Sequence, residues 1–205
     1  MDRERAVELR RAGVLLLVGA ALVVPAGLIV GPQDILADAL DGLQWEFHDW
    51  GRVAGGTLAF GMVLQWAGAG FLADAFGSNR ARYVAAAAAV IVGIGAVAVA
   101  VDSLGIHTLQ AGWAEELHDA IAVGVPRAAT MTLAAALVVL AGALWLGRVL
   151  PREVAAATAV AGAGSLIQAA FIDGGGFLLP SVTLGVVGIF ALGVAAAAEM
   201  AAWDG

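Results

Sequence analysis

Cysteine and lysine are both missing from this chain of 205 residues, and each absence narrows its class. Without cysteine there are no disulfides, no thiolate metal ligands and no cysteine nucleophile. The ten basic residues are all arginine and are outnumbered by seventeen acidic residues, so the formal net charge is −7. Phosphate binding requires a dense basic surface, and we therefore expect no nucleic-acid partner. The lysine-free composition, rich in alanine and glycine, is typical of a high-GC prokaryotic genome, archaea included.

Motifs of the common enzyme classes are also missing. The chain has no phosphate-binding glycine loop and no His-Glu-x-x-His pair, and its residues follow no Ser-His-Asp order. The long apolar runs carry no acidic residue at mid-depth, since Asp74 falls near the end of its run. Ion-coupled transporters usually carry such a carboxylate, and its absence counts against that class.

Apolar residues, in contrast, make up 61% of the chain, and the mean hydropathy is +0.92. A soluble domain is only about half apolar. Six runs approach the roughly 20 residues that a helix needs to cross a bilayer. They cover residues 12–30, 53–72, 83–101, 121–147, 154–172 and 177–198. The sequence thus predicts an all-α, polytopic membrane protein, a compact bundle of six transmembrane helices forming one integral membrane domain over residues 1–205.

The arginines predict the orientation of this bundle, because short cytoplasmic loops of membrane proteins are enriched in arginine and lysine. With the N-terminus inside, eight of the ten share one side: Arg3, Arg5, Arg10, Arg11, Arg80, Arg82, Arg148 and Arg152. Both termini are then cytoplasmic, and we expect a multi-pass protein of the prokaryotic cell membrane.

The first outer loop is predicted to hold an amphipathic helix at about residues 34–47. On a helical wheel its aspartates lie on one side and its leucines on the other. Such a helix either lies in the outer interface with its leucines buried or acts as a lid over a site between the spans.

One local pattern occurs twice. Trp45-Glu46-Phe47-His48-Asp49 precedes the second span, and Glu115-Glu116-Leu117-His118-Asp119 precedes the fourth. An arginine follows each copy before the long apolar run. Residues 12–75 and 83–148 are therefore either tandem copies of one hairpin or a chance match in a biased sequence. If they are copies, His48 and His118 occupy equivalent outer positions.

These polar residues form the predicted ligand-binding cluster of the outer face. Its members are His48, Asp49, Arg52, His107, Glu116, His118, Asp119 and Arg127. The histidines and carboxylates suit Zn²⁺, with His48, His107, His118, Asp49 and Asp119 as the metal set. The simpler interpretation is that they are solvated and cap helix starts, and no cofactor is then required.

Arg127 lies directly against apolar sequence, where an unpaired guanidinium costs several kcal/mol. Asp119, Glu116 and the acids of the first loop are the candidate partners. The alternative, which we favour, is that the side chain snorkels to the outer headgroups.

Glycines are frequent within the spans, and helices bearing small residues can approach closely. This favours a compact bundle over a roomy pore. Codon bias toward glycine and alanine explains the same pattern, so no single pair of small residues identifies an interface.

Several of these elements together resemble a known family. The stretch from His48 to Gly61, the Arg80/Arg82 loop, Asp102, and Leu117-His118-Asp119-Ala120 are similar to the uncharacterised six-helix membrane family catalogued as domain of unknown function 998. The resemblance covers roughly residues 45–148. It implies six spans and supplies no known activity.

The function expected from the sequence is non-enzymatic. We interpret the chain as a membrane subunit or small-ligand-binding module with an acidic, histidine-containing outer face. The alternative is a metal-dependent hydrolase at the outer leaflet that uses the predicted metal set. The expected partners are the lipid bilayer and other membrane subunits or further copies of the chain.

Overall fold

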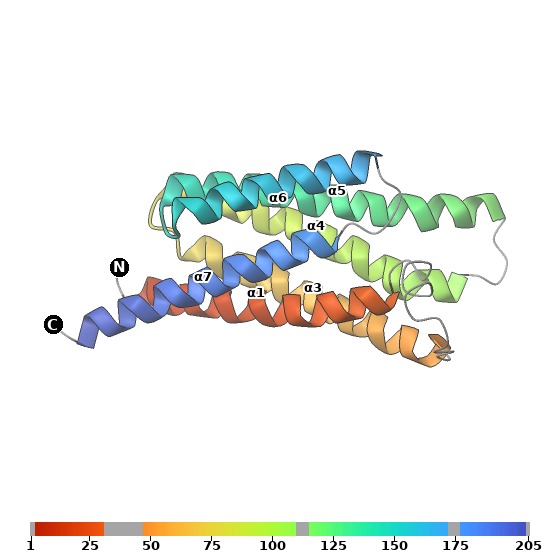
Figure 1. Ribbon diagram of the computed structural model, residues 1–205, viewed down its shortest axis with the longest axis horizontal. Coiled ribbons are helices and arrows are strands. Elements are labelled where there is room, and N and C mark those ends of the chain that lie inside the picture. Colours follow the sequence, from red (N-terminus) through yellow and green to blue (C-terminus); the bar gives the residue numbers. More distant parts are fainter. Residues whose placement is uncertain (1–2, 31–46, 110–114, 172–176, 204–205) are drawn as a thin grey trace.

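A computed structural model of the protein describes residues 3–30, 47–109, 115–171 and 177–203, with side chains for 3–28, 53–101, 124–171 and 177–202. The described backbone is helical apart from short connections (Figure 1). The helices are α1 (Arg3–Val30), α3 (Phe47–Asp74), α4 (Asn79–Leu109), α5 (Glu115–Gly147), α6 (Arg152–Phe171) and α7 (Leu178–Trp203). The amphipathic helix predicted at 34–47 falls almost wholly outside the described residues.

The prediction of an all-helical chain with six membrane-length segments is confirmed for the described residues, since all six helices are long and apolar enough to cross a bilayer. They have 20 to 33 residues, or roughly 30 to 50 Å at 1.5 Å per residue. Most begin earlier or end later than the apolar runs, because helical hydrogen bonding continues into the charged flanks. α1, for example, starts at Arg3 and not at Ala12.

The helices form two groups of three. α1 packs between α3 and α7, and α5 packs between α4 and α6. The groups are joined mainly through α3 and α4, whereas α6 and α7 touch much less although they are consecutive. In Figure 1, α1, α3 and α7 lie together below α5 and α6.

Glycine allows α1 to approach both of its neighbours. A Cβ atom placed on Gly19 would lie 2.7 Å from the carbonyl oxygen of Gly61 in α3, and one placed on Gly13 would lie 2.8 Å from that of Gly188 in α7. Real Cβ atoms do not come this close to backbone oxygen. Gly164 and Gly193, in contrast, face open space. The structure thus separates glycines that pack helices from glycines that only reflect composition.

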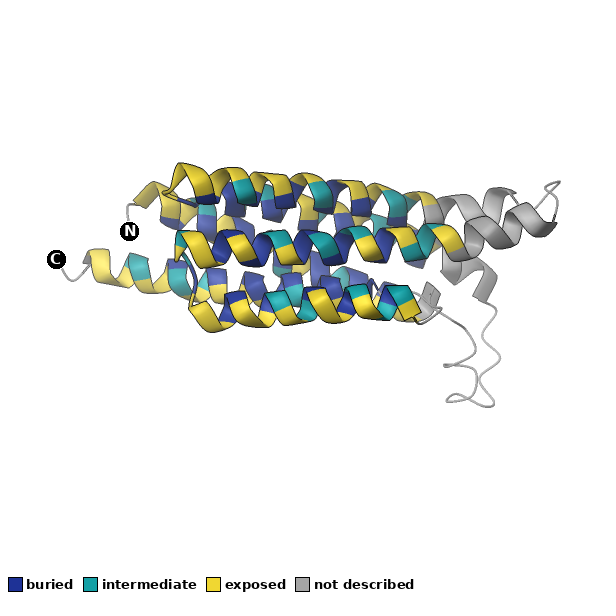
Figure 2. Ribbon diagram, turned by 90° about the horizontal axis from the view of Figure 1, so that it is seen from above, coloured by how far each residue is buried: buried dark blue, intermediate teal, exposed yellow. Residues whose placement is uncertain are grey.

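Leucine and alanine fill the interior, and large apolar side chains also cover the outside. Figure 2 shows buried and exposed residues alternating along each helix, as one inward face per helix requires. Outward side chains near mid-helix include Phe60, Ile94 and Val160, which are 59%, 58% and 73% exposed. Such a surface is matched by a hydrocarbon environment.

The chain direction alternates, so α1 begins, α3 and α4 connect, α5 and α6 connect, and α7 ends at the same end of the bundle (Figure 1). We call this the arginine-rich end, because eight arginines belong to it: Arg3, Arg5, Arg10, Arg11, Arg80, Arg82, Arg148 and Arg152. The other end is the opposite end.

Candidate functional site

The predicted outer cluster maps to α3, α4 and α5 toward the opposite end of the bundle. His48 and Asp49 are in the first turn of α3, His107 is in the last turn of α4, and His118 opens α5. Arg52 follows in α3, and Glu116 and Asp119 lie beside His118. Apart from Arg127, the side chains of this cluster lie outside the described residues. The predicted zinc site and its five ligands therefore stay a prediction.

The facing of His48 and His118 also stays a prediction. α3 and α5 run in the same direction, as the repeated hairpin requires, and both pack against α4. Among the described side chains, no three histidines, aspartates or glutamates are grouped closely enough to hold a metal ion. All three histidines are outside that set of side chains.

Arg127 is the member of the predicted cluster whose contacts are described. It lies in α5 directly after Pro126, and its side chain is half-buried. Nε donates a hydrogen bond to the carbonyl oxygen of Ala169 at 2.6 Å, and Nη2 donates one to that of Ala170 at 2.6 Å. Both acceptors belong to the last turn of α6, which ends at Phe171.

These two bonds make Arg127 the cap of a neighbouring helix. The last four carbonyls of an α-helix have no partner within the helix, and they form the negative end of the helix dipole. A guanidinium supplies both the donors and the positive charge. The sequence indicated only carboxylates and headgroups as partners for Arg127, so this acceptor was missed. The available signal was the end of an apolar run just before Asp173, which predicts a helix terminus needing donors.

A second polar contact lies inside the bundle. Gln65 of α3 is fully buried and donates from Nε2 to the carbonyl oxygen of Ser181 in α7 at 2.9 Å. The hydroxyl of Ser181 lies 3.7 Å from the sulfur of Met62. The Oε1 atom of Gln65 has no hydrogen-bond partner among the described residues. This contact ties α3 to α7, which otherwise hardly touch.

The arginine-rich end carries two cavities that the sequence did not predict. One, of about 480 Å³, is polar, and Arg5, Glu8, Asp74 and Arg82 are among its lining residues. An ion pair of 2.6 Å joins Arg82 to Asp74 across the connection between α3 and α4. It is exposed to solvent, so it contributes little to stability.

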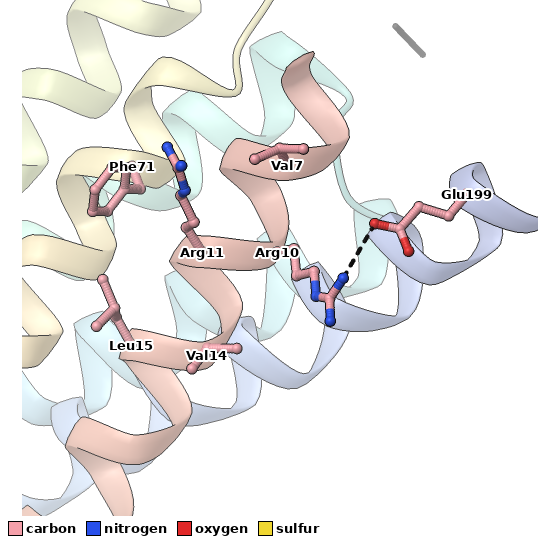
Figure 3. Close-up of a pocket in the computed structure, with 7 residues that line it drawn as sticks. All are labelled: Val7, Arg10, Arg11, Val14, Leu15, Phe71 and Glu199. Atoms are coloured by element: carbon pink, nitrogen blue, oxygen red, sulfur yellow. Dashed lines mark ion pairs between the residues drawn. The ribbon is translucent and has the colours of Figure 1, made fainter. Parts of the chain in front are cut away.

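The other cavity, of about 520 Å³, is an open groove along α1 between α3 and α7 (Figure 3). Its walls are mostly apolar, and Arg10, Arg11 and Glu199 carry the charges at its edge. Arg10 Nη1 lies 3.6 Å from Glu199 Oε1, and Arg11 Nη1 lies 3.0 Å from Glu8 Oε1. We call this cavity the α1 groove.

Comparison of the chain with known protein families, with curated proteins and with solved structures finds no match. The resemblance to the domain of unknown function 998 family therefore stays a prediction.

Proposed function

We propose that the protein is a non-enzymatic, multi-pass protein of a prokaryotic cell membrane that acts as a membrane subunit or small-ligand-binding module. Six apolar helices with exposed apolar side chains support its place in a bilayer. The observation that carries the non-enzymatic role is the contact of Arg127 with the end of α6. Arg127, the one cluster member whose side chain is described, thereby holds two helices together.

The arginine-rich end is the cytoplasmic end in this proposal, by the positive-inside rule. Impermeant maleimide tests it, because the natural chain has no cysteine and gives no background. In intact cells, Gly175→Cys, between α6 and α7, is expected to react. Ser78→Cys, between α3 and α4, is expected to react only after permeabilisation. Labelling of Ser78→Cys alone in intact cells would invert the orientation.

Metal-dependent hydrolysis at the outer leaflet is the second candidate. It is supported by the chain direction, which puts the helix ends that carry the five predicted ligands, His48, His107, His118, Asp49 and Asp119, at the same end of the bundle. Metal analysis of protein purified without chelators separates the two functions. Stoichiometric zinc that is lost in His118→Ala supports the hydrolase. Wild-type protein that contains no zinc after expression in zinc-supplemented medium supports the module.

A further inference from the structure

The outward face of α1, between α3 and α7, carries a row of exposed residues that we call the track. From the two arginines to mid-helix its exposed residues are short: Val14, Val18 and Ala21 follow one another down this face. From Arg11 to Ala21 is ten residues, or about 15 Å at 1.5 Å per residue. That is about half of the roughly 30 Å hydrocarbon core, the depth of one leaflet.

The α1 groove is the upper end of this track. In Figure 3, Val14 and Leu15 lie on α1 below the arginines, and Phe71 flanks them from α3. The guanidinium carbon of Arg11 lies 5.8 Å from the centre of the Phe71 ring, which keeps the charge at the edge of the apolar wall. A ligand that fits must have a long apolar part below and a charged part above.

Charge at the mouth of the groove has both signs. Arg10 and Glu199 are 65% and 43% exposed, and their 3.6 Å separation exceeds the 2.7–2.9 Å of a charge-assisted hydrogen bond. An exposed pair of this kind contributes about 1 kcal/mol or less, so a ligand can open it at little cost. Arg10 offers donors to a phosphate, Arg11 offers those that its 3.0 Å bond to Glu8 leaves available, and Glu199 offers an acceptor to a neighbouring cation.

We propose that the α1 groove binds one phospholipid with a phosphoethanolamine headgroup. Arg10 and Arg11 hold its phosphate, Glu199 accepts hydrogen bonds from its primary ammonium, and one acyl chain lies along Val14, Val18 and Ala21. A purely anionic headgroup would leave Glu199 facing negative charge. A choline headgroup carries the positive charge but has no N–H to donate. This inference rests on the proposed function, because it requires α1 to span a bilayer.

Native mass spectrometry of the intact protein tests the proposal, with phosphatidylethanolamine, phosphatidylglycerol and phosphatidylcholine of identical acyl chains as probes. We expect phosphatidylethanolamine to bind about fivefold more tightly than either of the others, which is the equivalent of about 1 kcal/mol. Glu199→Gln should abolish the preference over phosphatidylglycerol. Arg10→Gln combined with Arg11→Gln should weaken all three lipids.

Two further variants keep the result interpretable. Arg80→Gln removes an exposed arginine from the same end outside the groove and should leave the order unchanged. Val18→Trp fills the track without touching the headgroup and should weaken all three lipids equally. Each variant must elute from size exclusion as wild type does.

Equal binding of the three lipids by the wild type, or an unchanged order in Glu199→Gln, overturns the proposal. Extraction of membranes with alkaline carbonate distinguishes this result from failure of the proposed function. A chain that stays in the membrane pellet and shows no lipid preference refutes only the lipid site. A chain that carbonate releases into the supernatant refutes the proposal that the protein is an integral membrane protein.

Discussion

Replacing Arg127 with leucine should destabilise the bundle far more than removal of any exposed arginine. The variant leaves the carbonyls of Ala169 and Ala170 without the donors they have in the wild type. An unsatisfied buried carbonyl costs about 1–3 kcal/mol, and the lost charge at the end of α6 adds about 0.3–1 kcal/mol. Ala169 is buried and Ala170 is partly buried, so we expect the free energy of unfolding to fall by about 3–5 kcal/mol.

Arg127→Lys refines the test. Lysine keeps the positive charge near the end of α6 but replaces the planar fork with a single ammonium, which cannot reproduce two parallel bonds. We expect it to lose about half as much stability as Arg127→Leu. Arg80→Leu is the matched control, since Arg80 is exposed at the other end of the bundle, and it should change stability by less than about 0.5 kcal/mol.

The measurement is thermal unfolding in detergent, followed by the fluorescence of the six tryptophans. On the scale of soluble proteins of this size, a loss of 3–5 kcal/mol lowers the Tm by roughly 6–20 °C. Hydrogen exchange adds a local readout, because the last turn of α6 should fray in Arg127→Leu while α5 stays protected. If Arg127→Leu melts with the wild type and α6 exchanges no faster, the cap contributes nothing and the reasoning is refuted.

Three further outcomes follow from packing and backbone geometry, and each is read from the same melting assay. Gly19→Ala should lower the free energy of unfolding by about 1–3 kcal/mol because the added methyl meets the backbone of α3. Gly164→Ala, in open space, should be neutral or slightly stabilising. Equal effects of the two variants would contradict the close approach of α1 and α3. Gln65→Leu should change the free energy of unfolding by less than about 1 kcal/mol, since it removes one hydrogen bond together with an unpartnered oxygen. Gln65→Ala should lower it by more than about 2 kcal/mol because of the cavity it leaves. A larger loss in Gln65→Leu than in Gln65→Ala would show that the hydrogen bond dominates. Arg148 has a φ of 50° just after α5, so Arg148→Gly should gain about 0.5–1 kcal/mol, and a loss would point to side-chain contacts that outweigh backbone strain.

The positions of the membrane-length helices could be predicted from the sequence because hydrocarbon thickness sets a length that apolar runs must match. Their true ends could not. The turns around Arg3 and Asn79 are charged or polar and give no hydropathy signal, yet the backbone hydrogen bonds continue through them. α5 shows the same limit, since it begins at Glu115, six residues before the predicted run 121–147, and continues through Pro126.

Which helices are neighbours was beyond the sequence. The residue types alone cannot tell that Gly19 contacts α3 while Gly164 faces outward, since both are glycines within apolar runs. The partner of Arg127 was missed for a related reason. Backbone carbonyls carry no side-chain signature, so a search for acidic residues passes over them. The α1 groove likewise could not be predicted, because α3 and α7, which flank α1 on its two sides, are far apart in the sequence.

The pairing of α1 with α7 has a consequence for how the protein is made. α1 ends at Val30 and α7 begins at Leu178, so at 5–20 residues per second synthesis takes roughly 7–30 s to deliver the second after the first. During that interval the glycine-lined side of α1 that receives α7 has no cover from it. A nascent chain that stops before α7 is made therefore leaves this side of its first helix uncovered in the membrane. Truncations that remove only α7 should consequently be degraded as fast as those that remove several helices.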